Sequence, residues 1–128
     1  SAHNPHGAEA LAQAVTESFD FSELALVTGM MAEKDAKGVL SELLPIADAL
    51  FLSPVDSPRS MDVEELYQLA GAIDREGPTE VTESLVEALD AARSWAEQAE
   101  GRAVLVAGSV MLAGEAILCA RDQGWGIA

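Results

Sequence analysis

The sequence predicts an α/β protein, a three-layer α/β/α sandwich built on a mostly parallel, Rossmann-like sheet. Two observations lead to this prediction. Short apolar segments alternate along the chain with longer amphipathic ones, and the segment AVLVAGS (103–109) is uniformly apolar, which is typical of a strand buried on both faces. Strands that alternate with helices pair in parallel, because each helix carries the chain back across a face of the sheet.

The helices are predicted from apolar residues that recur on one helical face. The first helix has Asn4 as a candidate cap and Pro5 in its first turn, where a missing N–H costs nothing, and its face comprises Ala8, Leu11, Ala12, Val15 and Phe19. The second has Val39, Leu40, Leu43, Leu44 and Ala47. The third, capped by Asp62, has Val63, Leu66, Leu69, Ala70 and Ile73. The fourth, over 84–100, turns Leu85, Leu89, Ala92 and Ala96 inward and Glu87, Asp90, Arg93 and Glu97 outward.

The remaining segments complete the predicted alternation. Strands are expected at 24–29, 49–53 and 103–109, with a weak strand at 79–82 and a last helix over 110–122. We therefore expect one domain over 1–122 and a flexible tail over 123–128. The alternation also calls for a strand ahead of residue 1, so the first strand of the fold is expected to be truncated. An incomplete parallel sheet would have an exposed strand edge or slot.

Charge and composition exclude several classes of function. The chain has 22 acidic and 7 basic side chains and a net charge of −15, and such a field opposes nucleic-acid backbones and anionic membrane surfaces. No apolar run approaches the ~20 residues that cross a bilayer. The single cysteine, Cys119, excludes a disulfide framework and fits a cytoplasmic location.

The topology also predicts where ligands bind, because in open α/β sheets they sit beyond the carboxyl ends of the strands. The loops at that edge carry both histidines of the chain and three of its seven cations, Lys34, Lys37 and Arg59. This distribution fits either an anion-binding edge or ordinary polar loops. No cluster of Cys and His has zinc spacing, so no metal site is expected.

Each candidate residue in these loops has two interpretations. His3 can bind a phosphate or carboxylate, or hydrogen-bond locally. Asp35 can orient a cation or a ribose, or cap the helix after it. Arg59 can clamp a carboxylate, or remain solvated. Ser109 can donate to a substrate, or cap a helix. The stretch GSVMLAGE (108–115) is not a nucleotide P-loop, since it has five residues between its glycines and Glu115 where lysine should stand.

Four segments together resemble the C-terminal domain of folylpolyglutamate and dihydrofolate synthases, relatives of the muramyl-peptide (Mur) ligases. AHNPHGAEAL resembles the family's D-G-A-H-N-P-x-G-A segment, and GMMAEKD its G-x-x-x-D-K-D loop, with Glu33 where aspartate is usual. SPRSMDVEEL is similar to S-P-R-A-x-x-x-E-E-L, and VLVAGSVMLAGE to V-L-V-T-G-S-x-x-x-x-G-E. These landmarks follow one another in the family's order and span almost the whole chain. The family's aspartate ahead of A-H-N-P is absent, as is the strand that leads to it.

The resemblance implies an ATP-dependent ligase that forms an acyl phosphate on a folate or pteroate carboxylate, which the amino group of L-glutamate then attacks. It implies that ATP and Mg are bound mainly by an N-terminal ATPase domain of the same protein, over which this domain closes. His3 then matches the histidine near the reacting phosphate and glutamate. Asn4 shapes its loop, Lys34 and Asp35 lie on the nucleotide side, and Ser109 and Arg59 on the substrate side. The fragment alone would be inactive.

Two alternatives to the folate ligase remain at this point. The chain can be a stand-alone doubly wound α/β module that binds a ligand or regulates a partner, or the corresponding domain of a muramyl-peptide ligase. All three interpretations depend on one spatial expectation, which is that the segments around His3, Lys34, Arg59 and Ser109 meet at one rim of the sheet.

Overall fold

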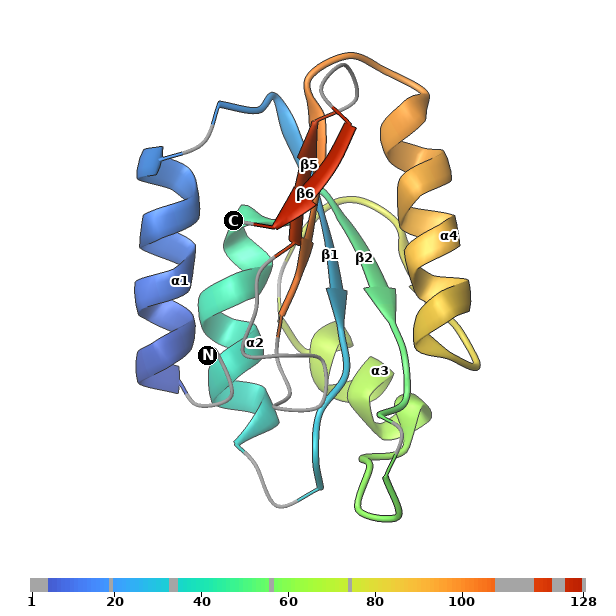
Figure 1. Cartoon of the computed structure of the whole chain (residues 1–128). Helices are drawn as coiled ribbons and strands as arrows, with labels where there is room; N and C mark the ends of the chain where they lie inside the picture. The colour runs from blue at the N-terminus through green and yellow to red at the C-terminus, as the bar shows by residue number, and fades with distance from the viewer. Residues whose placement is uncertain are drawn as a thin grey trace.

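The structure, a computed structural model, alternates helices and strands as the sequence predicts up to residue 106. It describes residues 5–18, 20–32, 35–55, 57–73, 75–107, 117–120 and 124–127. The helices are α1 (Pro5–Ser18), α2 (Ala36–Leu43), the 3-10 helix η1 (Leu44–Ile46), α3 (Val63–Gly71) and α4 (Leu85–Glu97). The strands are β1 (Glu23–Thr28), β2 (Ala49–Leu52), β3 (Thr79–Val81), β4 (Arg102–Val106), β5 (Ile117–Ala120) and β6 (Gly124–Ile127). Figure 1 shows their arrangement.

The strands form one six-stranded sheet in the order β3-β2-β1-β4-β5-β6. Strand β1 is central and pairs in parallel with β2 on one side and with β4 on the other, so that Ala25 lies between Ala49 and Val104. Strand β3 adds a further parallel strand beyond β2. Strands β5 and β6 continue the sheet beyond β4 in antiparallel pairing. The mostly parallel sheet expected from the sequence is therefore confirmed.

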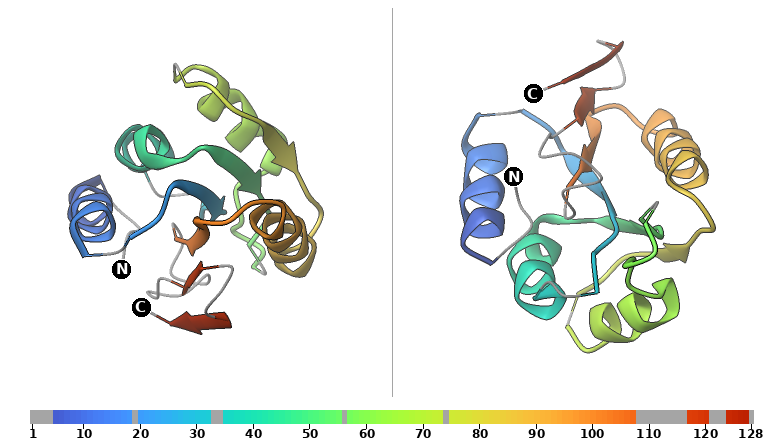
Figure 2. Two further views of the ribbon diagram at one scale, coloured as in Figure 1. Left: turned by 90° about the horizontal axis from the view of Figure 1, so that it is seen from above. Right: turned by 60° about the horizontal axis from the view of Figure 1, so that its bottom comes forward.

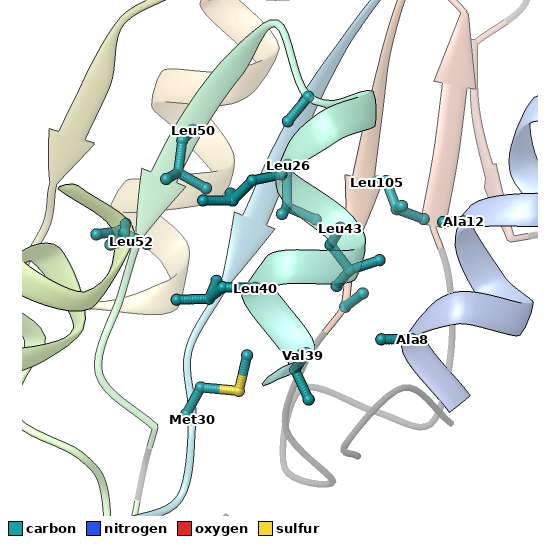
Figure 3. Packing of buried hydrophobic residues seen from close by; sticks show 14 of the residues in the cluster. Ala8, Ala12, Leu26, Met30, Val39, Leu40, Leu43, Leu50, Leu52 and Leu105 are labelled. Carbon is teal, nitrogen blue, oxygen red and sulfur yellow. The ribbon is translucent and has the colours of Figure 1, made fainter. Parts of the chain in front are cut away.

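Helices cover both faces of this sheet, which confirms the three-layer prediction. Alternate residues of β1 belong to different cores, because side chains alternate across a strand. Leu24 and Leu26 pack in the larger core, which includes buried residues of α1, α2 and α3. Val27 packs in the smaller core with the buried alanines of α4. Figure 2 shows α4 on the opposite face of the sheet from α1 and α2, and Figure 3 shows the packing of the larger core around Leu26, Leu40 and Leu43.

Local sequence determines where the helices begin and end. Helix α1 begins at Pro5, as predicted. Helix α2 ends at Leu43 and passes into η1, because Pro45 has no N–H with which to continue an α-helix. Asp62 caps α3 through a 2.9 Å bond from the Glu64 N–H, which confirms the predicted cap. None of the described helices is both long and apolar enough to cross a membrane.

The C-terminal segment differs from the prediction. The sequence predicts a helix over 110–122. At 117–120 this prediction is wrong, because the structure has strand β5 there. A second strand, β6, lies within 123–128, where a flexible tail was expected, while the domain boundary at residue 122 stays a prediction. Ile117–Ala120 is a short apolar segment that suits either conformation, and pairing with the edge of β4 decides for the strand.

The expected exposed edge, left by a missing first strand, stays a prediction. Strand β5 pairs with Ala103 and Val104 in the amino half of β4, whereas β1 pairs with β4 along its whole length. Among the described strands, none pairs with Leu105 or Val106 on the side away from β1. Leu105 and Val106 are nevertheless buried, so this half of β4 is not an exposed edge.

Candidate functional site at the carboxyl edge of the sheet

The parallel strands end at a common rim. Ser53, just after β2, donates its N–H to the carbonyl of Thr28 at the end of β1, at 3.0 Å. Ala107, just after β4, donates to the carbonyl of Val27, also at 3.0 Å. The hydrogen-bonded ladder thus continues one residue past the ends of β2 and β4. Helices α1 and α2 begin at this same end of the molecule (Figure 1).

Two loops at this rim are joined to each other by backbone hydrogen bonds. The segment after β1 and the segment before α3 form an isolated antiparallel bridge between Met31 and Ser60. The Ala32 N–H donates to the carbonyl of Arg59 at 2.7 Å, and the Met61 N–H donates to the carbonyl of Met30 at 2.8 Å. The loop that leads to Lys34 and the loop that carries Arg59 therefore lie side by side at the rim.

The loop that carries Arg59 is held in shape from within. The Ser57 hydroxyl accepts a bond from the Arg59 N–H at 3.1 Å. The Ser60 hydroxyl accepts a bond from the Val55 N–H at 2.8 Å and donates to the carbonyl of Met61 at 3.2 Å. Val55 and Met61 are buried, while Arg59 is exposed. These bonds hold the backbone at Val55 and over 57–61, and the Arg59 side chain lies at the surface.

Gly29 allows the two loops to approach each other closely. A β-carbon at this position would lie well inside the contact distance of the Ser53 carbonyl oxygen, and 3.3 Å from a methyl group of Val55. The residue after β1 must therefore be glycine for the segments after β1 and β2 to pass each other in this way. Met30 and Met31 follow it and are buried beneath the rim.

Asp35 caps a helix, which is one of its two predicted roles. Its Oδ1 accepts a 3.0 Å bond from the Gly38 N–H at the start of α2. The residue is nevertheless exposed, so the carboxylate also faces solvent. The predicted contact of Asp35 with a nucleotide stays a prediction.

Of the predicted site residues, the structure describes Asp35 and Arg59 and places both at the carboxyl edge. His3, Asn4, Lys34 and Ser109 lie outside the described residues. The elements beside them do meet at the rim, since α1 begins there and β4 ends there (Figure 1). Sequence reasoning did not identify Gly29 or Ser60 as residues that shape the site. A glycine directly after a buried strand is the one signal that could have indicated a close backbone approach.

The described residues form no metal site at this rim. Among them, no group of three or more His, Cys, Asp or Glu residues could hold an ion. Among the groups that the structure describes, the only one with a resolved pKa shift is Arg75, in the connection before β3 at the opposite edge of the sheet. Burial lowers the pKa of the Arg75 guanidinium, and nearby Asp48 partly offsets this effect. Arg75 donates a 3.0 Å hydrogen bond to Thr79 Oγ1, so its role is structural.

Comparison with known proteins identifies the family. The family described as "Mur ligase, glutamate ligase domain" matches residues 1–110. The chain belongs to this family of Mur ligase domains. The match includes the positions of His3, Asn4, Lys34 and Ser109 and both joined loops.

Individual relatives agree with this assignment. The domain is 37% identical to the dihydrofolate synthase/folylpolyglutamate synthase of Mycobacterium tuberculosis, over 91% of this chain and 26% of that protein. The structure of the M. tuberculosis folylpolyglutamate synthase complexed with ADP and AMPPCP superposes with a TM-score of 0.80 at 38% identity, over 88% of this chain and 26% of that one. The structure of E. coli FolC in complex with DHPP and ADP superposes with a TM-score of 0.73 at 30% identity, over 86% of this chain and 25% of that one. The domain thus spans about a quarter of the length of these relatives.

Proposed function

We propose that this Mur ligase domain is the C-terminal domain of an ATP-dependent ligase that adds L-glutamate to folate or dihydropteroate. The observation that carries the proposal is the joining of the two motif loops, with Arg59 and the segment before Lys34 bonded side by side where the strands end. The similarity to relatives named as folylpolyglutamate and dihydrofolate synthases supports the choice of substrates. The single cysteine of the chain fits a cytoplasmic enzyme.

In the proposed reaction, the folate carboxylate attacks the γ-phosphorus of ATP and ADP leaves, which gives an acyl phosphate. The amino group of glutamate then attacks the acyl carbon, the phosphate leaves, and an amide forms. The rim supplies positioning and positive charge for the anionic reactants, which is the main contribution a protein makes to phosphoryl transfer. His3 would lie near the reacting phosphate and the glutamate, while Ser109 and Arg59 would hold substrate.

The nucleotide site would be shared with a second domain. His3, Asn4, Lys34 and Asp35 would form one wall of it, and the exposed Asp35 carboxylate would accept a bond from a ribose hydroxyl while it caps α2. As the family resemblance implies, phosphate binding and the Mg ion would belong mainly to an N-terminal ATPase domain. The ion would neutralise developing charge on the phosphates.

The test is substrate-dependent release of ADP by the complete ligase chain that contains this domain. We expect ADP release that requires both glutamate and a folate or dihydropteroate. His3→Ala should lower turnover by about 10²-fold or more, as for removal of a group that acts on the transition state. Release that depends on a muramyl peptide would instead assign the domain to a cell-wall ligase. Unchanged kinetics in His3→Ala would overturn the role of that residue.

A further inference from the structure

We propose that Ser60 is a positioning residue that holds Arg59 for the carboxylate of the amino-acid substrate. This inference rests on the proposed ligase function and adds to it a residue and the mode of its action. Ser60 stands where the resembled S-P-R-A segment has alanine, so its hydroxyl is a feature of this chain.

The hydroxyl of Ser60 joins the two ends of the Arg59 loop. It accepts the Val55 N–H at 2.8 Å at the beginning of the loop and donates to the Met61 carbonyl at 3.2 Å at its end. Val55 is only 4% exposed, so its N–H has little access to water as a replacement partner. Loss of the hydroxyl would leave a buried N–H without an acceptor and loosen the loop.

The backbone of the same residue joins this loop to the neighbouring one. Ser60 forms the antiparallel bridge with Met31, and the residues on either side of Ser60 make the bonds to Ala32 and Met30. A change in the path of the loop at Ser60 is therefore transmitted directly to Arg59, whose carbonyl is bonded to the Ala32 N–H at 2.7 Å. The side chain of Ser60 thus sets the backbone position from which the Arg59 side chain extends.

An arginine on a hydrogen-bonded backbone suits a carboxylate ligand. Arginine binds a carboxylate through two parallel N–H bonds, and this arrangement tolerates little displacement. Arg59 is exposed, on a loop whose backbone is bonded on both sides, in a protein whose net charge of −15 would otherwise repel an anion. A fixed backbone at Arg59 would lower the conformational cost of binding the amino-acid substrate there.

The experiment measures steady-state kinetics of the complete ligase, with wild type, Ser60→Ala, Ser60→Thr and Arg59→Ala. We expect Ser60→Ala to raise KM for glutamate about fivefold to tenfold, the effect of one lost hydrogen bond, with kcat changed by less than about twofold. Ser60→Thr keeps the hydroxyl and should restore most of the affinity. Ser41→Ala is the matched control, because it removes a serine hydroxyl bonded to the Lys37 carbonyl on α2, away from this loop.

A double-mutant cycle distinguishes positioning from a general loss of structure. If Ser60 acts through Arg59, Ser60→Ala should add no further rise in KM in the Arg59→Ala background. An equal rise in both backgrounds, or an unchanged KM in Ser60→Ala, would overturn the positioning role while leaving the ligase function intact. Absence of glutamate-dependent ADP release in the wild type would overturn the proposed function and this assignment together.

Discussion

Three buried hydroxyl-bearing residues lie where adjacent strands end, and they differ in their hydrogen bonds. Thr82, just after β3, donates to the carbonyl of Leu52 at 2.9 Å, and Ser53 donates to the carbonyl of Pro54 at 3.1 Å. The hydroxyl of Thr28, at the end of β1, is buried and has no hydrogen-bond partner among the described residues. A buried hydroxyl that makes no bond costs free energy, whereas a bonded one is close to neutral or favourable.

This difference predicts opposite effects of one substitution. Thr28→Val replaces the unbonded hydroxyl by a methyl group of similar size, and we expect it to raise the free energy of unfolding by about 1 kcal/mol. Thr82→Val removes the hydrogen bond to Leu52 and should lower the free energy of unfolding by about the same amount. Urea denaturation of the two variants measures both changes. A destabilised Thr28→Val would mean that the hydroxyl has a partner in solution.

Glycines give a second prediction at the residue scale. Gly29→Ala should destabilise the domain by about 2 kcal/mol, because the new β-carbon would press on the Ser53 carbonyl, part of a rigid backbone. Gly71→Ala is the control, since nothing lies within 4 Å of a β-carbon there. In a helix, that change should stabilise by about 0.5 kcal/mol. Thermal unfolding compares the two, and equal melting temperatures would contradict the close approach at Gly29.

At the scale of elements, periodicity predicted the helices because each buries one face. The inward face of α4 includes Ala92 and Ala96 as expected, and also Ala88, which the pattern did not single out. Leu85 and Leu89, expected inward, are only partly buried. Small residues give a weak periodic signal, so the exact orientation of this helix could not be predicted from its sequence.

The end of the chain shows where local sequence was insufficient. Ile117–Ala120 carries four consecutive residues of low polarity, and their conformation depends on pairing with β4, which is distant in sequence. Gly124–Ile127 contains two glycines, which weaken any strand signal. The pairing of the loops through Met31 and Ser60 also could not be predicted from local sequence, because it links residues 29 positions apart without any repeating pattern.

A single arginine links β1, β4 and α4 at the edge opposite the candidate site. Arg102 bonds Glu23 at 2.9 Å and the Trp95 carbonyl at 2.8 Å, and its guanidinium lies 4.2 Å from the Trp95 ring centre. We expect Arg102→Lys to lower the free energy of unfolding by about 1 kcal/mol, because an ammonium cannot make the planar contacts together. Glu23→Gln should cost less than about 0.5 kcal/mol, since Glu23 is 44% exposed and its ion pair is screened. Chemical denaturation distinguishes these contributions, and equal costs would assign the stabilisation to the ion pair.

On the scale of the whole molecule, the rim was predictable because it follows from topology. Parallel strands joined by helices end at one edge, whatever their side chains, and β1, β2 and β4 do so. The positions of Arg59 and Asp35 at that edge followed from their places in the chain. The cap formed by Asp35 was also one of its predicted roles. The hydrogen bonds of the Arg59 loop were not predicted, because loop geometry depends on contacts such as that of Gly29 with Ser53, which no local pattern encodes.

The net charge of −15 predicts how the domain responds to salt. Like charges on a compact surface repel one another more than they do in an expanded chain, so the charge opposes folding and salt should relieve this effect. We expect the melting temperature to rise by a few degrees when NaCl is increased from about 0.05 M to about 0.5 M. Asp90→Asn, which removes one exposed charge from α4, should raise the melting temperature at low salt and reduce the rise with salt. A melting temperature that falls as salt is added would mean that attractive ion pairs, such as that of Arg102 with Glu23, outweigh the repulsion.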